Sequence, residues 1–312
     1  MFEPDLGRLS AHLEAIVGER HLRSSPRSHH ASGEYLRAHL EGCGAEVREQ
    51  IVEGPHGRGR NIVADLHGSR PELPRWIVGA HYDTVRGSPG ADDNGSAVAG
   101  LLELGTLLRG ARLEQTVTLV GWDMEEAQAG SGSLLGSRAM ASRERAPAAA
   151  IAGVIALEMI GYRDRRPGSQ RFPFGLDWFF PAELRAQRAR GLRGDFIAAI
   201  GDRAARPMLE ALEQAAGQFE LPLVRLELGL LSGLIPHFHR SDHAPFWARG
   251  VPALMLTDTA EFRNPHYHRP SDTLETLDLD FLGQVVQTVA SAIARLAGPK
   301  PGGPRAGAPD AS

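Results

Sequence analysis

Residues 76–84 read WIVGAHYDT, an apolar run that becomes polar at His81. Five consecutive residues without a charge are typical of a strand that is buried on both faces of a sheet. Similar runs at 117–120, 151–157 and 252–256 are separated by segments with helical periodicity. This alternation predicts an α/β fold with a largely parallel sheet that is covered on both faces. Ligands bind such sheets where the strands end, so the residues after each run are candidates for function.

Weaker patterns extend this prediction to most of the chain. We expect further strands at 46–52, 61–66, 196–200 and 223–226, and helices at 6–16, 31–40, 96–108, 131–142, 203–219 and 280–296. The segment 163–193 is rich in arginine and aromatic residues, and we expect a loop over one end of the sheet. The aromatic side chains between 172 and 180 either wall a pocket or pack in the core or a lid. Residues 1–297 are predicted to form one domain, and the Pro/Gly/Ala-rich residues 298–312 a disordered tail.

The composition excludes several classes of protein. The chain has 312 residues with 34 basic and 38 acidic side chains, so its formal net charge is −4. A general nucleic-acid binder would need a basic surplus to neutralise phosphates, so we expect no nucleic-acid partner. Cys43 is the only cysteine, which excludes an intrachain disulfide and a thiolate zinc site. We see neither a signal peptide nor a membrane-spanning run, and therefore expect a cytoplasmic protein without a membrane partner.

Histidine and carboxylate side chains gather where the predicted strands end. Each group alone has an ordinary structural explanation, such as a helix cap or a solvated turn. Together they fit a cation site better, because like charges crowd at one edge of the sheet and carboxylates directly after apolar runs are costly unless paired. Imidazole and carboxylate ligands suit Zn²⁺, Mn²⁺ or Co²⁺. The groups are His81 with Asp83, Asp92 with Asp93 and Asn94, Asp123 with Glu125 and Glu126, Glu158, and finally His266, His268 and Asp272.

The order of these motifs resembles the di-zinc exopeptidases. This family includes bacterial leucyl-type aminopeptidases, glutamate carboxypeptidase and glutaminyl cyclase. The resemblance covers residues 81–273, and it implies a single three-layer catalytic domain with a mixed, mainly parallel sheet flanked by helices. The motifs that carry it are GAHYDT (79–84), GADDNGSA (90–97), the pair Glu125-Glu126, LEMIGY (157–162), SDHAPFW (241–247) and NPHYHRPSDT (264–273).

The resemblance also implies a set of metal ligands. Asp93 would bridge two zinc ions, with Mn²⁺ or Co²⁺ as other candidates. His81 and Glu158 would complete the first site, and Glu126 and His268 the second.

Roles outside the ligand set follow from the same resemblance. Glu125 would be the general base that activates a water shared by the two metals, and would then pass its proton to the leaving amine. Asp83 would orient His81, and Asp92 would have a local structural role.

Several positions depart from the pattern of the family. Glu158 stands where many relatives have Asp, and residues 127–133, AQAGSGS, differ from the usual sequence after the two glutamates. Phe238 occupies a position where some relatives place a tyrosine that helps to hold the oxyanion. We expect either that His239 or Arg240 replaces it or that the metals suffice.

Asp242 and His243 match the family motif after this position. We expect them to support or line the substrate pocket, although a helix-opening aspartate with a capping role explains Asp242 as well.

The leading functional prediction is a metal-dependent aminopeptidase that acts on peptides or small amides. A glutaminyl-cyclase-like aminoacyltransferase with one zinc remains an alternative, because cyclases keep much of the same ligand set. A carboxypeptidase is another, since the arginine-rich segment 163–193 could bind a free carboxylate. A non-enzymatic scaffold is disfavoured, because every expected ligand position carries His, Asp or Glu. The preferred terminal residue and the oligomeric state stay open.

Overall fold

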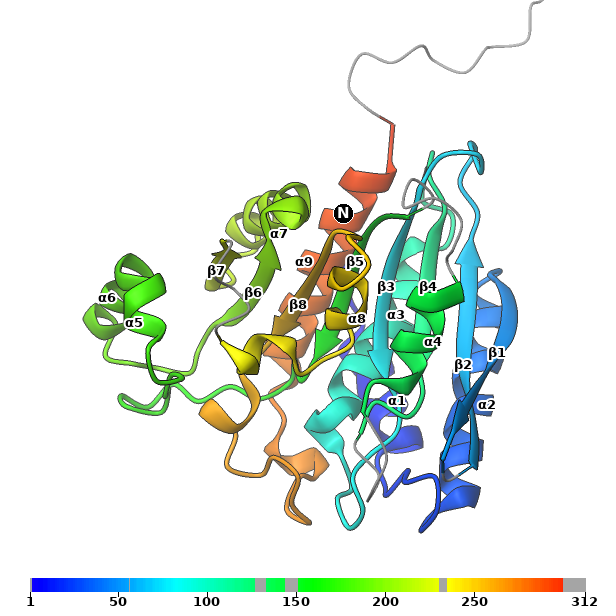
Figure 1. Cartoon of the computed structure of the whole chain (residues 1–312), viewed down its shortest axis with the longest axis horizontal. Coiled ribbons are helices and arrows are strands. Elements are labelled where there is room, and N and C mark those ends of the chain that lie inside the picture. Colours follow the sequence, from blue (N-terminus) through cyan, green and yellow to red (C-terminus); the bar gives the residue numbers. More distant parts are fainter. Residues whose placement is uncertain (1, 56, 127–132, 144–150, 230–234, 300–312) are drawn as a thin grey trace, which may run out of the picture.

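A computed structural model describes residues 2–55, 57–126, 133–143, 151–229 and 235–299. Its centre is a twisted sheet with the strand order β1-β2-β4-β3-β5-β8-β6-β7 (Figure 1). Strands β3, β4, β5 and β8 run parallel, as do β6 and β7, whereas the β1–β2, β2–β4 and β6–β8 pairs are antiparallel. The strands are β1 (Glu46–Gly54), β2 (Gly57–Leu66), β3 (Arg75–His81), β4 (Val117–Trp122), β5 (Ile151–Glu158), β6 (Ile197–Asp202), β7 (Leu223–Leu228) and β8 (Ala253–Thr257).

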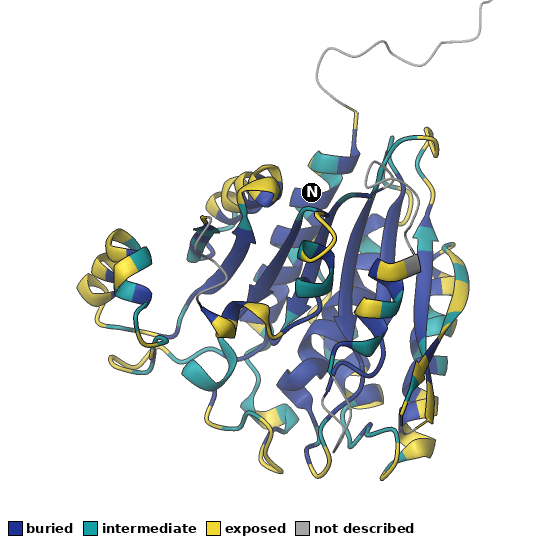
Figure 2. Cartoon of the chain, viewed as in Figure 1, coloured by how far each residue is buried: buried dark blue, intermediate teal, exposed yellow. Residues whose placement is uncertain are grey.

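Helices cover both faces of this sheet and complete three layers. Helices α1, α2, α3, α7 and α9 pack on one face, and α4 and α8 pack on the other (Figure 1). The central strands are buried on both sides (Figure 2), which explains their uninterrupted apolar sequences. The helices are α1 (Leu6–Ile16), α2 (Pro26–Gly42), α3 (Ala97–Leu108), α4 (Leu135–Arg143), α5 (Leu176–Phe179), α6 (Pro181–Ala189), α7 (Arg206–Gln218), α8 (Ala244–Trp247) and α9 (Leu279–Ala297).

The predicted α/β fold is confirmed, and each predicted strand is found with small changes at its ends. Helix α2 begins five residues before the predicted start at 31, because Pro26 fits the first turn of a helix. The predicted helix at 131–142 corresponds to α4, and residues 131 and 132 lie outside the described part. Most of the predicted tail, residues 300–312, also lies outside it.

The segment 163–193 is not the simple loop that its composition predicted. It contains the short helices α5 and α6, which pack with strands β6 and β7 in a small apolar cluster of their own. Pro181 opens α6, and Gly175 precedes α5 with a positive φ of 83°. Gly175 therefore marks the start of α5, and Pro181 separates α5 from α6.

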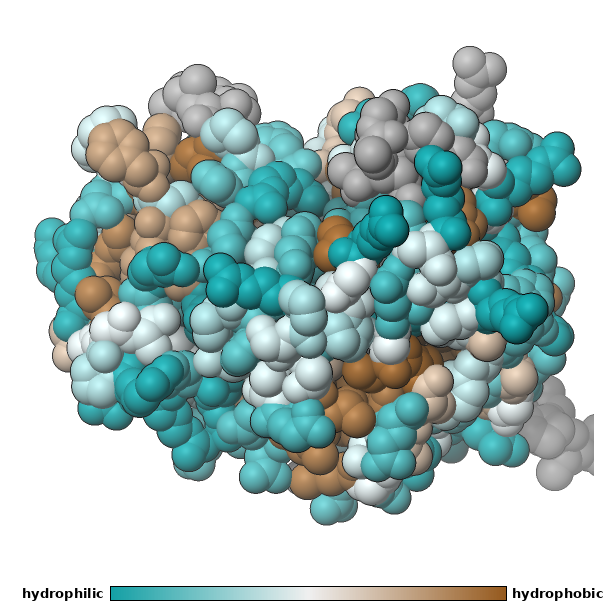
Figure 3. All heavy atoms as spheres, turned by 90° about the horizontal axis from the view of Figure 1, so that it is seen from below, coloured by the Kyte–Doolittle hydropathy of each residue, from teal (hydrophilic) through white to brown (hydrophobic). Residues whose placement is uncertain are grey.

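The parallel strands bring the functional motifs to one edge of the sheet. Strands β3, β4, β5 and β8 all end at this edge, so the residues that follow them face a common space. Viewed from that end (Figure 3), the surface is mainly hydrophilic, with apolar side chains exposed in a few patches. Among the described helices, none is both long and apolar enough to cross a membrane.

Candidate metal centre

Five separate segments deliver histidine and carboxylate side chains to this edge. His81 is the last residue of β3, and Glu158 is the last residue of β5. Glu126 follows β4, and Asp93 lies in the turn η1 (Ala91–Ser96) that leads into α3. His268 comes from the long connection between β8 and α9. All the ligand positions that the resemblance implied therefore occupy the strand ends or the loops beside them.

Asp93 lies between two histidine–carboxylate pairs. Its Oδ1 atom is 3.5 Å from His81 Nε2, and its Oδ2 atom is 3.1 Å from His268 Nε2. On the first side, Glu158 Oε1 lies 3.6 Å from His81 Nε2. On the second side, Glu126 Oε1 lies 3.2 Å from His268 Nε2. One ligand atom each of His81, Asp93 and Glu126 lies within 4.8 Å of the others, close enough to share a metal ion.

The electrostatics of this cluster favour a bound cation. Burial raises the pKa of Glu126 to about 7, with the charge of Asp93 adding to the effect. Burial also raises the pKa of Glu125 well above its usual value. Burial alone would lower the pKa of His268, but Asp93 and Glu126 outweigh it and raise the value to about 10. Crowded buried carboxylates of this kind need positive charge, and their oxygen and imidazole donors suit Zn²⁺, Mn²⁺ or Co²⁺.

Asp83 holds two parts of the centre together. The backbone N–H groups of Glu125 and Glu126 donate to its two carboxylate oxygens at 3.0 and 3.1 Å. Its backbone oxygen lies 3.2 Å from His81 Nδ1, and its carboxylate lies 3.6 Å from the same atom. Asp83 thus contacts the ring nitrogen of His81 that faces away from Asp93, and it also fixes the turn after β4. The hydrogen bonds that Asp83 accepts from the turn after β4 were not expected from the sequence.

Asp92, next to Asp93, has the local structural role that was expected. It accepts hydrogen bonds from Ser96 Oγ at 2.9 Å, from the N–H of Gly161 at 3.0 Å and from Asn264 Nδ2 at 2.7 Å. These bonds tie η1 to the segment after β5 and to the loop that carries His268.

Asp123 is likewise structural, although it belongs to the same acidic run as Glu125 and Glu126. It accepts from Tyr82 Oη at 2.8 Å and pairs with His29 Nε2 at 2.7 Å. Burial lowers the pKa of His29, but its hydrogen bond to the Asp123 carboxylate and the negative charge of that group together outweigh burial, so the net shift of the pKa is upward.

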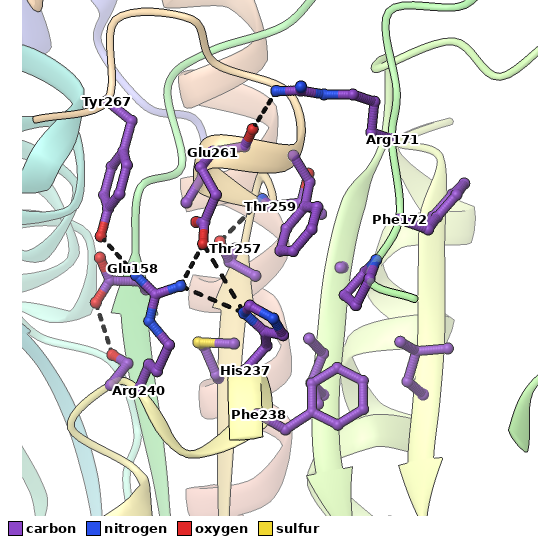
Figure 4. Close-up of a pocket in the computed structure, with 18 of the residues that line it drawn as sticks. Glu158, Arg171, Phe172, His237, Phe238, Arg240, Thr257, Thr259, Glu261 and Tyr267 are labelled. Carbon is purple, nitrogen blue, oxygen red and sulfur yellow. Dashed lines mark hydrogen bonds and ion pairs between the residues drawn. The ribbon is translucent and has the colours of Figure 1, made fainter. Parts of the chain in front are cut away.

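A pocket adjoins the cluster, and two of the five residues that we expected at a substrate pocket line it (Figure 4). Phe238 and Arg240 line it together with Glu125 and Glu158. Arg240 donates to Tyr267 Oη at 3.1 Å and pairs with the carboxylate of Glu261.

The other residues expected near Phe238 do not line this pocket. His239 packs edge-on against Trp247, with ring centroids 5.4 Å apart. His243 is fully buried, and its Nε2 lies 2.8 Å from the backbone oxygen of Phe238. Asp242 is also buried, and burial raises its pKa to about 7 although the charge of His81 opposes this shift. His243 therefore holds the backbone of a residue that lines the pocket, whereas the ring of His239 lies against Trp247. The expectation that His239 or Arg240 helps to hold the oxyanion stays a prediction.

The aromatic side chains of segment 172–180 were expected either to wall a pocket or to pack in the core or a lid, and the structure shows both a pocket contact and core packing. Phe172 lines the pocket, as does the aliphatic Leu176, whereas Phe180 packs in the apolar cluster beneath α5 and α6. Phe174 and Trp178 are mostly exposed and contact each other edge-on.

Sequence reasoning missed three residues that shape the site. Tyr267 stacks on His268 with ring centroids 3.8 Å apart, and its position inside the motif NPHYH could have suggested this. Ser241 Oγ donates to Glu158 Oε2 at 2.6 Å. Arg20 is buried and belongs to no motif. It donates to the backbone oxygens of Ile16, Gly18, Tyr82, Pro89 and Gly90.

Comparisons with known proteins agree with this geometry. The chain is 37% identical over 271 residues to the uncharacterized protein YfbL of Escherichia coli strain K12, covering 83% of this chain and 77% of that protein. It is 28% identical over 237 residues to a probable leucine aminopeptidase of Trichophyton verrucosum, covering 71% of this chain but only 53% of the fungal protein.

Solved structures show the same fold. An aminopeptidase from Aneurinibacillus sp. strain AM-1 matches with a TM-score of 0.70 at 14% identity, over 96% of this chain and 95% of the other. The glutaminyl cyclase of Porphyromonas gingivalis matches with a TM-score of 0.67 at 23% identity, over 93% and 98%. The model of peptidase family M28 matches residues 61–293, a stretch that contains each of the residues brought together around Asp93. The resemblance seen in the motifs is thus confirmed, and the chain belongs to peptidase family M28.

Proposed function

We propose that the chain is a metal-dependent aminopeptidase that removes the N-terminal residue from peptides or small amides. The observation that carries this proposal is the position of Asp93 between two histidine–carboxylate pairs. His81, Glu158 and one oxygen of Asp93 would hold one zinc ion, and Glu126, His268 and the other oxygen would hold a second. When bound, two such cations polarise a carbonyl group and lower the pKa of a nearby water.

Glu125 is the residue best placed to move the proton. Its carboxylate lines the pocket, whereas its backbone N–H is fixed by Asp83. Glu125 takes a proton from the attacking water and delivers it to the amine that leaves, so that the amide becomes a carboxylic acid and an amine. A general base of this kind contributes roughly 10²- to 10⁴-fold to the rate.

The surroundings favour an aminopeptidase over a carboxypeptidase. A carboxypeptidase needs a cation for the free carboxylate of its substrate. Two arginines line the pocket, and both already have oxygen partners: Arg240 is paired with the carboxylate of Glu261, and Arg171 donates to the backbone oxygen of the same residue at 2.7 Å. The fungal relatives named as leucine aminopeptidases point in the same direction, although the chain spans only about half to two thirds of their length.

The test is to measure metal content and turnover together. The protein is assayed with Zn²⁺, Mn²⁺ or Co²⁺ on amino-acid anilides, dipeptides and N-terminal glutaminyl peptides. We expect about two metal ions per chain and release of the terminal residue. The Glu125→Gln variant should keep its metal and lose activity by roughly 10²- to 10⁴-fold.

The other outcomes are equally informative. One tightly bound zinc with a pyroglutamyl product and no peptide cleavage would establish the cyclase instead. Cleavage from the carboxyl end would establish a carboxypeptidase. Full activity of Glu125→Gln would remove that residue from the mechanism.

A further inference from the structure

The floor of the pocket consists of two rows of side chains that run across the sheet. The first row starts at Glu158 and continues through its direct partners in the neighbouring strands, Thr257 in β8, Ala198 in β6 and Val224 in β7. Partners in register point to the same face of a sheet, so these side chains form a continuous line. All four line the pocket. The floor thus begins at a residue of the metal centre and ends at the edge strand.

The second row lies beside the first and is entirely apolar. It consists of Met255 in β8, Ile200 in β6 and Leu226 in β7, which are again direct partners in the sheet. All three line the same pocket. In the first row, Thr257 turns its hydroxyl oxygen toward the N–H of Thr259, which donates to it at 2.9 Å, so the floor beyond Glu158 carries no charge.

The opposite wall of the pocket has apolar side chains beyond a polar rim, and this rim includes Arg171, which donates to the backbone oxygen of Glu261 at 2.7 Å. Phe172, Pro173 and Leu176 approach from the segment between β5 and β6, and Phe238 approaches from the other side. Figure 4 shows Arg240, Glu261 and His237 between the metal side of the pocket and these aromatic rings. We name the apolar part beyond these three residues, bounded by the two rows and this wall, the acyl recess.

The acyl recess is longer than any natural aliphatic side chain. The part of the first row beyond Glu158 runs from Thr257 through Ala198 to Val224. These three adjacent strands are separated by two spacings of about 4.8 Å, so this part spans roughly 10 Å. A leucine side chain reaches only roughly 4 Å beyond its Cα, because it has three bonds of about 1.5 Å in series. Val224 and Leu226 in the edge strand β7 still line the pocket, so the recess reaches the far end of both rows.

We propose that the acyl recess binds the unbranched apolar side chain of a 2-amino acid that has about eight to ten carbons in total and whose carbonyl is the scissile one. The preferred substrates are then amides of long-chain 2-amino acids, a lipid-like class, rather than peptides that begin with leucine. This inference rests on the proposed function and deepens it. Hydrolysis adds water across the C–N bond and releases the long-chain amino acid and an amine.

A chain-length series of substrates tests the proposal on the wild-type protein. The substrates are p-nitroanilides of unbranched 2-amino acids with five, six, eight, ten and twelve carbons, compared with leucine p-nitroanilide. Because each buried methylene adds a similar free energy, kcat/KM should rise roughly three- to fourfold per carbon up to eight or ten carbons. A maximum at six carbons or fewer would overturn the proposal.

Two variants test whether the dependence of kcat/KM on chain length arises from the acyl recess. Ala198→Leu fills the middle of the first row, so activity on the ten-carbon substrate should fall at least tenfold, while that on the five-carbon substrate changes less than twofold. Leu226→Ala opens the far end and should move the optimum to longer chains. Leu223→Ala is its matched control, since it removes the same atoms from the same strand but on the opposite face, where Leu223 packs on the main core. An unchanged length profile in Ala198→Leu contradicts the assignment.

A binding measurement separates this inference from the proposed function. If no anilide is cleaved with any metal, the aminopeptidase proposal fails, and the recess is then tested by calorimetry with the free 2-amino acids. Tighter binding of 2-aminodecanoic acid than of norvaline, lost in Ala198→Leu, supports the recess on its own. Equal binding of the two acids overturns it. If leucine anilide is cleaved but longer chains are not, the function stands and the recess fails.

Discussion

Asp93 has its two oxygens directed to different histidines, His81 and His268, so this one residue joins both halves of the centre. The backbone around it is fixed from below, because Asp272 accepts hydrogen bonds from the N–H groups of Asp92 and Asp93 at 2.9 and 3.1 Å. A carboxylate held this firmly loses little further freedom when it binds a cation. This preorganisation is what a catalytic metal site requires.

Asp83→Asn tests the residue that supports the centre from outside the ligand set. The amide of asparagine offers one acceptor where Asp83 now satisfies two N–H groups, those of Glu125 and Glu126, so the turn after β4 should loosen. We expect zinc affinity to fall roughly 10- to 100-fold. Competition with a chromogenic chelator measures it. Asp164→Asn, at a surface pair with Arg166, is the control, and equal affinities in both variants would contradict the role.

Among single residues, the sequence predicted the side chains that belong to motifs but not those that bind backbone groups. His81, Asp93, Glu126, Glu158 and His268 were predicted as ligands, and the structure brings them together. Their assignment as metal ligands remains a prediction. Arg20 could not be found, because its partners are carbonyl groups that any sequence provides. Asp242 and His243 were expected near the pocket from the motif alone, and only the fold shows that both are buried and do not line it.

Among the elements, the buried strands were the most predictable. Strands such as β3 and β5 are covered on both faces, so their sequences are continuously apolar and have few alternatives. Helices α5 and α6 were not predicted, because they are short and belong to a small apolar cluster apart from the main core. Short helices are stabilised mainly by such packing. The few apolar residues that provide it are hard to recognise in a segment rich in arginine.

Helices α1 and α2 meet at the buried His12 and the partly buried His39, a pair that should make stability depend on pH. The rings of His12 and His39 are in edge contact, with centroids 4.5 Å apart, and His12 Nδ1 lies 2.8 Å from Tyr35 Oη. Burial, with the positive charges of His39 and Arg8, lowers the pKa of His12 to about 4. The neutral ring is therefore favoured in the folded state. Its contribution is complete above the unfolded pKa of about 6.5 and is lost as the pH falls toward 4.

His12→Leu should remove this dependence. Between pH 7.5 and pH 5, the unfolding free energy of the wild type should fall by about 2 kcal/mol more than that of the variant, as the two pKa values require. Urea denaturation at both pH values measures the difference. The exposed His67 supplies the control, His67→Leu. Parallel pH profiles for wild type and His12→Leu would show that His12 titrates normally.

For the molecule as a whole, metal binding should be coupled to protons and to stability. Glu126, with a pKa of about 7, and His268, with a pKa of about 10, must each lose a proton before they hold a cation. Zinc affinity should therefore rise at least tenfold per pH unit between pH 6 and pH 8. The increase in melting temperature on adding zinc should be larger at pH 8 than at pH 6, with Mg²⁺ as the control. An affinity independent of pH would refute the coupling.

The centre draws on residues as far apart as His81 and His268, and this spacing has a consequence during synthesis. A ribosome releases the chain from its N-terminus, so strands β3 and β4 emerge long before the loop that carries His268. Until that loop docks, Asp93 and Glu126 lack one of the two histidines beside them. A nascent or truncated copy therefore cannot assemble the whole centre. The group of side chains around Asp93 is therefore complete only after the chain has been synthesised beyond residue 268 and the loop has docked.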